Sequence, residues 1–140
     1  MNLCDMKTVR QIMAMFGLTF RKEFGQNFLT DRFVVEDIAE LCCFDSESTI
    51  FEIGPGIGTL TYELALRRKQ VVALEIDRGL IPVLKYTLDE FDNVRVINED
   101  VMQTDLEDLL APYFAQAVGN LGLDHNCDIF KRQPALQQLH

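Results

Sequence analysis

The stretch that decides the fold reads Glu52-Ile53-Gly54-Pro55-Gly56-Ile57-Gly58 and places glycine at alternate positions. It continues the apolar segment 50–53, which reads as a strand, and a helix is expected over 58–68. Glycine suits positions where the backbone turns tightly and approaches a ligand without an intervening Cβ. The stretch therefore predicts a strand–turn–helix unit whose turn binds a ligand; a tight turn without a ligand is the alternative.

The spacing of these glycines narrows the class of ligand. A dinucleotide site needs a third glycine three positions after its second, and Thr59 occupies that position here. The spacing therefore disfavours NAD and FAD, and with them an oxidoreductase. A ligand that does not place a phosphate on the turn needs only the close approach of the backbone.

The pattern of strand, short connection and helix continues along the chain. Strands are predicted at 70–76, 93–98 and 114–118, and a short helix at 105–110. A further helix must begin close to Pro82, because proline is tolerated only in a first helical turn. Alternating strands and helices predict an α/β fold with a parallel, doubly wound sheet, in which segment 70–76 is buried on both faces.

Two amphipathic helices are predicted before this sheet. The first ends at Gly17 and carries apolar residues at helical spacing, namely Val9, Ile12, Met13 and Phe16. A polar, glycine-punctuated loop follows over 21–31, and Asp31 is expected to cap the second helix. The buried stripe of that second helix is expected to consist of Val34, Ile38 and Leu41.

Acidic residues follow the second and third predicted strands. Glu75 ends the second strand, where a carboxylate can accept both hydroxyls of a ribose, and Asp77 points the same way or caps the next helix. Asp100 follows the third strand, and its carboxylate can accept from the amino group of an adenine. Together with the glycine turn, these acids predict a nucleoside site at the carboxyl ends of the strands. Solvated acids at strand ends are the alternative.

The composition describes one domain of ordinary globular type, with 140 residues of which 48% are hydrophobic and 25% charged. The net charge of −9 repels a polyanion, so the surface as a whole does not read as a nucleic-acid platform. Residues 1–32 carry five basic and three acidic side chains, so we expect any polyanion to bind at the N-terminal end. No apolar run approaches the roughly 20 residues of a membrane span, and the N-terminus does not read as a signal peptide.

The cysteines have neither paired spacing nor the density of a secreted scaffold, and they read as reduced thiols of a cytosolic protein; they are Cys4, Cys42, Cys43 and Cys127. His125 lies two residues from Cys127, but two ligands without a second pair make a poor metal site. We therefore expect no metal.

Four motifs in this order resemble those of the ribosomal RNA adenine dimethyltransferases, from about Leu18 to Asn120. They are the glycine stretch 52–58 and the segments Gly25-Gln26-Asn27-Phe28-Leu29-Thr30-Asp31, Ala73-Leu74-Glu75-Ile76-Asp77 and Asn98-Glu99-Asp100. The resemblance implies a Rossmann-like class I methyltransferase domain, followed in the family by a small helical domain. It also implies S-adenosylmethionine as cofactor, and dimethylation of the exocyclic amine of adenine in small-subunit ribosomal RNA in the cytoplasm.

The resemblance also implies a role for individual residues. Asn27 and Leu29 close over the cofactor from the N-terminal loop, and Gly54 lies beside its methionine part. Glu75 holds the ribose hydroxyls and Asp100 the adenine. Asn120 ends the fourth strand, where its side chain accepts hydrogens of the target amine, so it is both the catalytic residue and a cofactor neighbour. In the family the basic N-terminal segment faces RNA.

The chain departs from the family after Asn120-Leu121, where it continues Gly122-Leu123-Asp124-His125 in place of a proline and an aromatic residue. The aromatic residue stacks the flipped base, so its loss removes much of the alignment of the amine. We expect a cofactor- and RNA-facing segment at 1–30, an incomplete methyltransferase domain at 31–120 and a divergent polar tail at 121–140. A truncated or frame-shifted remnant, which binds S-adenosylmethionine or RNA without transferring a methyl group, is the alternative.

Overall fold

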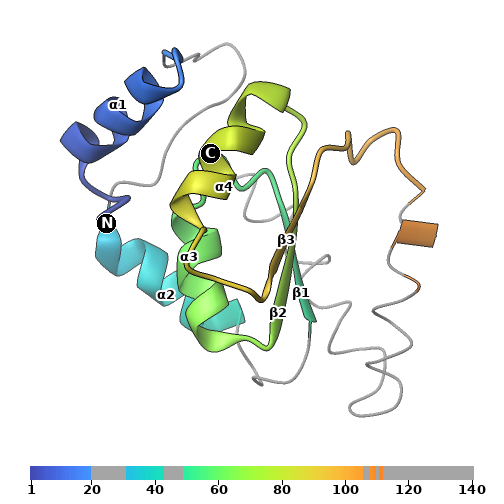
Figure 1. Ribbon diagram of the computed structural model, residues 1–140. Helices are drawn as coiled ribbons and strands as arrows, with labels where there is room; N and C mark the ends of the chain where they lie inside the picture. The colour runs from blue at the N-terminus through green and yellow to red at the C-terminus, as the bar shows by residue number, and fades with distance from the viewer. Residues whose placement is uncertain (20–30, 43–48, 106–107, 110, 112–140) are drawn as a thin grey trace.

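The computed structural model describes residues 1–19, 31–42, 49–105, 108–109 and 111. Figure 1 shows the order of the elements along the chain. None of the helices in these ranges is long and apolar enough to cross a membrane. The elements are helix α1 (Met6–Met15), helix α2 (Arg32–Cys42), strand β1 (Thr49–Ile53), helix α3 (Thr59–Arg67), strand β2 (Gln70–Leu74), the 3-10 turn η2 (Arg78–Leu80), helix α4 (Ile81–Thr87) and strand β3 (Val94–Ile97).

The three strands form a parallel sheet in the order β1-β2-β3. Ile50 pairs with Val71, and Val71 pairs with Val94, so β2 lies between its neighbours. Residues 71–74 of β2 are buried, which confirms the prediction of a central strand, but β2 ends at Leu74, and Ile76 of the predicted segment 70–76 is exposed. The predicted parallel α/β arrangement is therefore confirmed for these three strands, whereas the predicted strand 114–118 and the tail 121–140 lie outside the described residues.

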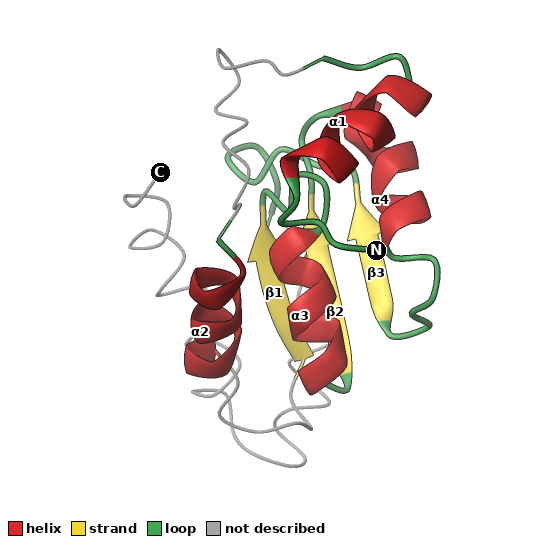
Figure 2. Ribbon diagram, turned by 90° about the vertical axis from the view of Figure 1, so that its left-hand side faces the viewer, coloured by secondary structure: helices red, strands yellow, loops and turns green. Residues whose placement is uncertain are grey.

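Helices α2, α3 and α4 lie on one face of the sheet, as Figures 1 and 2 show. On that face Ile50 and Val71 pack against Leu64 and Ala65 of α3 and against Ala39 of α2. The opposite face carries a second apolar cluster, and Leu109, from the short helix predicted at 105–110, packs against it. Apolar packing on both faces agrees with a doubly wound sheet. The buried members of this second cluster are Phe51, Val72 and Leu74.

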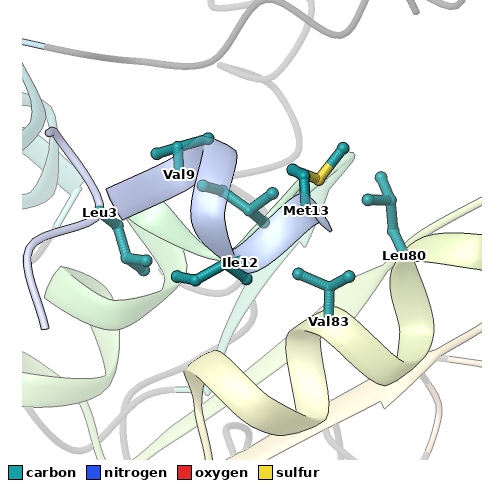
Figure 3. Packing of buried hydrophobic residues seen from close by; sticks show 7 residues of the cluster. Leu3, Val9, Ile12, Met13, Leu80 and Val83 are labelled. Carbon is teal, nitrogen blue, oxygen red and sulfur yellow. The ribbon is translucent and has the colours of Figure 1, made fainter. Parts of the chain in front are cut away.

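Helix α1 packs on the α4 side of this layer. Its buried residues Val9, Ile12 and Met13 join Leu80 and Val83, as Figure 3 shows, with Leu3 and Ile57 completing the cluster. The predicted apolar stripe of the first helix is confirmed by this packing. Gly17 then ends the helix with a positive φ of 69°, as predicted from the sequence.

The predicted buried stripe of α2 is wrong by one position. Val34 and Leu41 are exposed, whereas Val35 and Ala39 are buried and Ile38 is partly buried. Both sets recur at helical spacing, so periodicity alone does not decide which set faces the sheet. The predicted cap is correct, since the Asp31 carboxylate accepts from the backbone N–H groups of residues 33 and 34 at 3.0 and 3.4 Å.

Of the glycines compared, Gly58 has the least room for a side chain. Its φ is +96°, and a Cβ built there would lie 3.0 Å from Thr87 Oγ1, whose hydroxyl donates to the Ile57 carbonyl at 2.7 Å. We expect Gly58→Ala to lower the free energy of unfolding by about 2–4 kcal/mol, because it adds a steric clash to backbone strain. Urea denaturation measures this loss.

Gly17→Ala is the matched control for this substitution. Gly17 also has a positive φ, of +69°, but nothing lies within 4 Å of its built Cβ. Only backbone strain applies there, so we expect a loss of about 1 kcal/mol. Equal losses for the two variants would contradict the packing of the glycine turn against α4.

Candidate cofactor-binding site

The residues predicted for the site follow the carboxyl ends of the three strands. Figure 2 shows the strands pointing the same way, so that the segments after them share one edge of the sheet. Gly54 follows β1, Glu75 follows β2, and Asp100 comes three residues after β3. Ligands of open α/β sheets bind at this edge. The fold therefore brings the described members of the predicted site to one edge.

Glu75 joins the loops that follow β1 and β2. The backbone N–H of Gly56 donates to Glu75 Oε1 at 3.1 Å, and that of Asp77 donates to Oε2 at 2.8 Å. The Glu75 residue is only 4% exposed, so it is not the solvated strand-end acid of the alternative interpretation. Asp77 caps η2 by accepting from the Gly79 N–H at 2.9 Å, in agreement with the helix-cap alternative for that residue.

The turn after β1 leaves its backbone open to a ligand. The three glycines have positive φ values of 72°, 61° and 96° at Gly54, Gly56 and Gly58. A Cβ built on Gly54 would meet nothing within 4 Å, while its N–H donates to the Leu74 carbonyl at 2.9 Å. The turn is thus fixed against β2, and empty space lies on the side where a side chain would otherwise project.

Asn98 connects the carboxyl end of β3 to that of β2 by hydrogen bonds. Its Nδ2 donates to the carbonyl oxygens of Glu75 and Ile76 at 2.8 and 3.3 Å. Sequence reasoning missed this role, although an amide side chain directly after a strand was a visible signal. Asp100 follows in a turn, where Oδ1 accepts from the Met102 N–H at 2.9 Å. Asn98, which lies two residues before Asp100, therefore fixes the position of the Glu75 backbone.

Two buried carboxyl groups lie in this part of the fold. Burial raises the pKa of Glu75, against the opposing effect of the Asp77 and Gly56 N–H groups. Burial raises the pKa of Glu52 in β1 to about 7, partly offset by the Thr61 hydroxyl and reinforced by the negative charge of Glu75. Sequence reasoning gave Glu52 no role, although a carboxylate between Phe51 and Ile53 in an apolar strand was the signal.

The remaining predicted site residues lie outside the described part of the chain. Asn27, Leu29 and Asn120 are among them, and so are His125 and Cys127. Among the residues that the structure does describe, no three His, Cys, Asp or Glu side chains gather as a group that could hold a metal. Cys4 is a free thiol.

The raised pKa of Glu52 makes stability depend on pH. The folded chain holds this proton up to a pKa of about 7, whereas the ordinary value is 4.5, so the contribution of Glu52 is present below pH 4.5 and lost as pH rises through 7. We expect Glu52→Gln to gain up to about 3 kcal/mol relative to wild type between pH 5 and 8. Urea denaturation at several pH values measures this difference.

Asp89→Asn is the control for the stability measurement. It removes one negative charge from an exposed position after α4. We expect its stability difference from wild type to stay constant over the same pH range. A constant difference for Glu52→Gln as well would contradict the assignment of a buried, protonated carboxyl group to β1.

Comparisons with known proteins show the family of this chain. The model of the family described as ribosomal RNA adenine dimethylase matches residues 17–132. Ribosomal RNA small subunit methyltransferase A of Streptococcus equi subsp. zooepidemicus is 43% identical over 113 residues, which are 81% of this chain and 39% of the relative. The protein of that name from Streptococcus pneumoniae (strain ATCC 700669 / Spain 23F-1) is 46% identical over 106 residues, which are 76% of this chain and 37% of the relative.

The crystal structure of the 23S rRNA methyltransferase ErmE superposes with a TM-score of 0.53 at 40% identity, over 56% of this chain and 32% of that one. The described sheet and helices are therefore part of a Rossmann-like class I methyltransferase fold, as predicted. This chain spans about two fifths of the length of the curated relatives it matches. On the extent of the match and the identity to these relatives, the chain belongs to the ribosomal RNA adenine dimethylase family.

Proposed function

We propose that this chain carries the S-adenosylmethionine site of a methyltransferase that dimethylates the exocyclic amine of adenine in small-subunit ribosomal RNA. The observation that carries the proposal is the buried Glu75 carboxylate, fixed by the N–H groups of Gly56 and Asp77 beside the open backbone of Gly54. The names of the curated relatives support ribosomal RNA of the small subunit as the substrate.

The described residues fit this cofactor. A carboxylate offers about four lone-pair positions, and the N–H groups of Gly56 and Asp77 occupy one on each oxygen of Glu75; we propose that its remaining acceptor capacity takes the ribose hydroxyls. The Ile76 side chain beside it is 65% exposed and offers an apolar surface to a base. Asp100 has one carboxylate oxygen bonded within its own turn, and we propose that its other oxygen accepts from the adenine amine. The open side of Gly54 receives the methionine part.

When bound, S-adenosylmethionine supplies a methyl group on a positively charged sulfur. The residues of this chain bind and orient, and no metal is part of the proposal. Asn27 and Leu29 cover the cofactor from the N-terminal side, and the Asn120 side chain accepts hydrogens from the adenine amine as it attacks. Gly122 follows where the family carries a proline, so this chain lacks that contribution to the alignment of the base.

The N-terminal segment 1–30 is proposed to face RNA, because residues 1–32 carry five basic and three acidic side chains in a chain with a net charge of −9. Residues 31–120 then form the cofactor-binding domain, and 121–140 a divergent tail. Since the proposed substrate belongs to the small ribosomal subunit, the place of action is the cytoplasm.

Glu75→Gln tests the cofactor site. The amide NH₂ group of glutamine donates and cannot accept a hydrogen bond. One backbone N–H therefore loses its acceptor, and so does one ribose hydroxyl. We expect the affinity for S-adenosylmethionine to fall by roughly 10- to 100-fold, measured by titration calorimetry. The exposed-acid variant Asp89→Asn should bind as wild type does. Equal binding by Glu75→Gln and wild type would rule out Glu75 as the ribose acceptor.

Methyl transfer tests the reaction itself. Small ribosomal subunits that lack the adenine methyl groups are incubated with the chain and labelled S-adenosylmethionine, and incorporation into RNA is measured. Incorporation above that of the Glu75→Gln variant supports the proposed reaction. Tight cofactor binding without any incorporation would contradict transfer by this chain and restrict its function to cofactor binding.

A further inference from the structure

Glu52 is a buried acid for which the proposed reaction has no use. It lies in β1 with 4% exposure and pairs in register with Ala73, so its side chain and that of Glu75, two residues beyond Ala73, project from the same face. The Thr61 hydroxyl donates to Glu52 Oε1 in a short hydrogen bond at 2.5 Å. Within the described part of the chain, no group bonds the other carboxyl oxygen of Glu52.

In the described ranges, the groups around Glu52 provide no positive charge that would stabilise its ionised form. From α3 it meets Thr61, which does not titrate, while Glu63 and Arg67 of that helix pair with each other at 2.8 Å. From the β2 side it meets Glu75, whose own neighbour Asp77 is also acidic. No positive group acts on Glu52 among the residues that the structure describes. A buried carboxyl group beside another acid keeps its proton to a higher pH than an exposed one.

We propose that Glu52 senses the charge of the bound cofactor: it releases its proton to solvent when the cationic methyl donor occupies the site beside Glu75, and keeps its proton when the product is bound. This inference rests on the proposed function. S-adenosylmethionine carries a positively charged sulfur, whereas S-adenosylhomocysteine carries a neutral thioether. A nearby positive charge stabilises the ionised form of a buried acid. Glu52 acts through this field and does not need to touch the ligand.

As a consequence, the affinity of the site for the methyl donor, relative to its affinity for the product, increases with pH. Because donor binding releases a proton, the affinity for the donor must increase with pH through the range in which Glu52 titrates. The pKa of about 7 puts this range near neutrality. We expect the affinity ratio of donor to product to increase roughly fivefold between pH 6 and 8 in wild type, and to change less in Glu52→Gln.

Titration calorimetry at pH 7 in two buffers of different ionisation enthalpy gives the number of protons released on binding. We expect donor binding to release about half a proton more in wild type than in Glu52→Gln. The ammonium group of the ligand also titrates, and comparing two variants with the same ligand cancels its contribution. With the product, wild type and Glu52→Gln should release equal amounts. Asp89→Asn, which removes an exposed negative charge, should match wild type with both ligands.

A measurement on wild type keeps the test independent of the folding of Glu52→Gln. Carbon-13 NMR of the glutamate carboxyl groups follows the Glu52 titration directly, and its midpoint should fall on addition of donor and stay near 7 with product. Donor binding without a fall in this midpoint, or equal proton release by wild type and Glu52→Gln, would overturn the role of Glu52 alone. Failure of both ligands to bind would overturn the proposed function, and this inference with it.

Discussion

The Glu75 carboxylate is the point on which the site depends. It accepts from the N–H of Gly56 in one loop and from the N–H of Asp77 in the next, so one side chain sets the separation of two strand ends. Asn98 adds the third strand end by donating to the carbonyl of Glu75. The same carboxylate that orders these loops is therefore the acceptor offered to the ribose, and little reorganisation is needed on binding.

This arrangement places two acids in a region that excludes water. Glu52 and Glu75 are each 4% exposed, and burial raises the pKa of both. Buried charge lowers stability, so a fold selected for stability alone would place apolar side chains there. The arrangement becomes understandable if the site receives a positively charged ligand, because the ionised carboxylates are then compensated only in the complex. Thr61 and the two N–H groups keep the acids in place until that happens.

The strand ends were predictable from the sequence, whereas the contacts between them were not. Gly54, Glu75 and Asp100 follow apolar segments, and parallel strands bring their carboxyl ends together whatever the details of packing. The place of Glu52 in an apolar strand was visible, but its hydrogen bond with Thr61 depends on how α3 lies over β1, which no local pattern encodes. The face of α2 was mispredicted for a related reason: its orientation is set by docking on α3, where Arg67 bonds Glu40 at 2.8 Å. Long-range contacts of this kind need the assembled fold.

The most direct measurement is a pair of amide NMR spectra of the chain, recorded with and without S-adenosylmethionine. If Glu75 both anchors the loops and receives the ribose, the amide signals of Gly56 and Asp77 shift together on addition of the cofactor, because the carboxylate they bond to changes its partners. Signals of Thr49 and Gln70, which begin β1 and β2 at the opposite edge of the sheet, should stay in place. Binding that leaves the Gly56 and Asp77 signals unchanged would contradict the central role of Glu75.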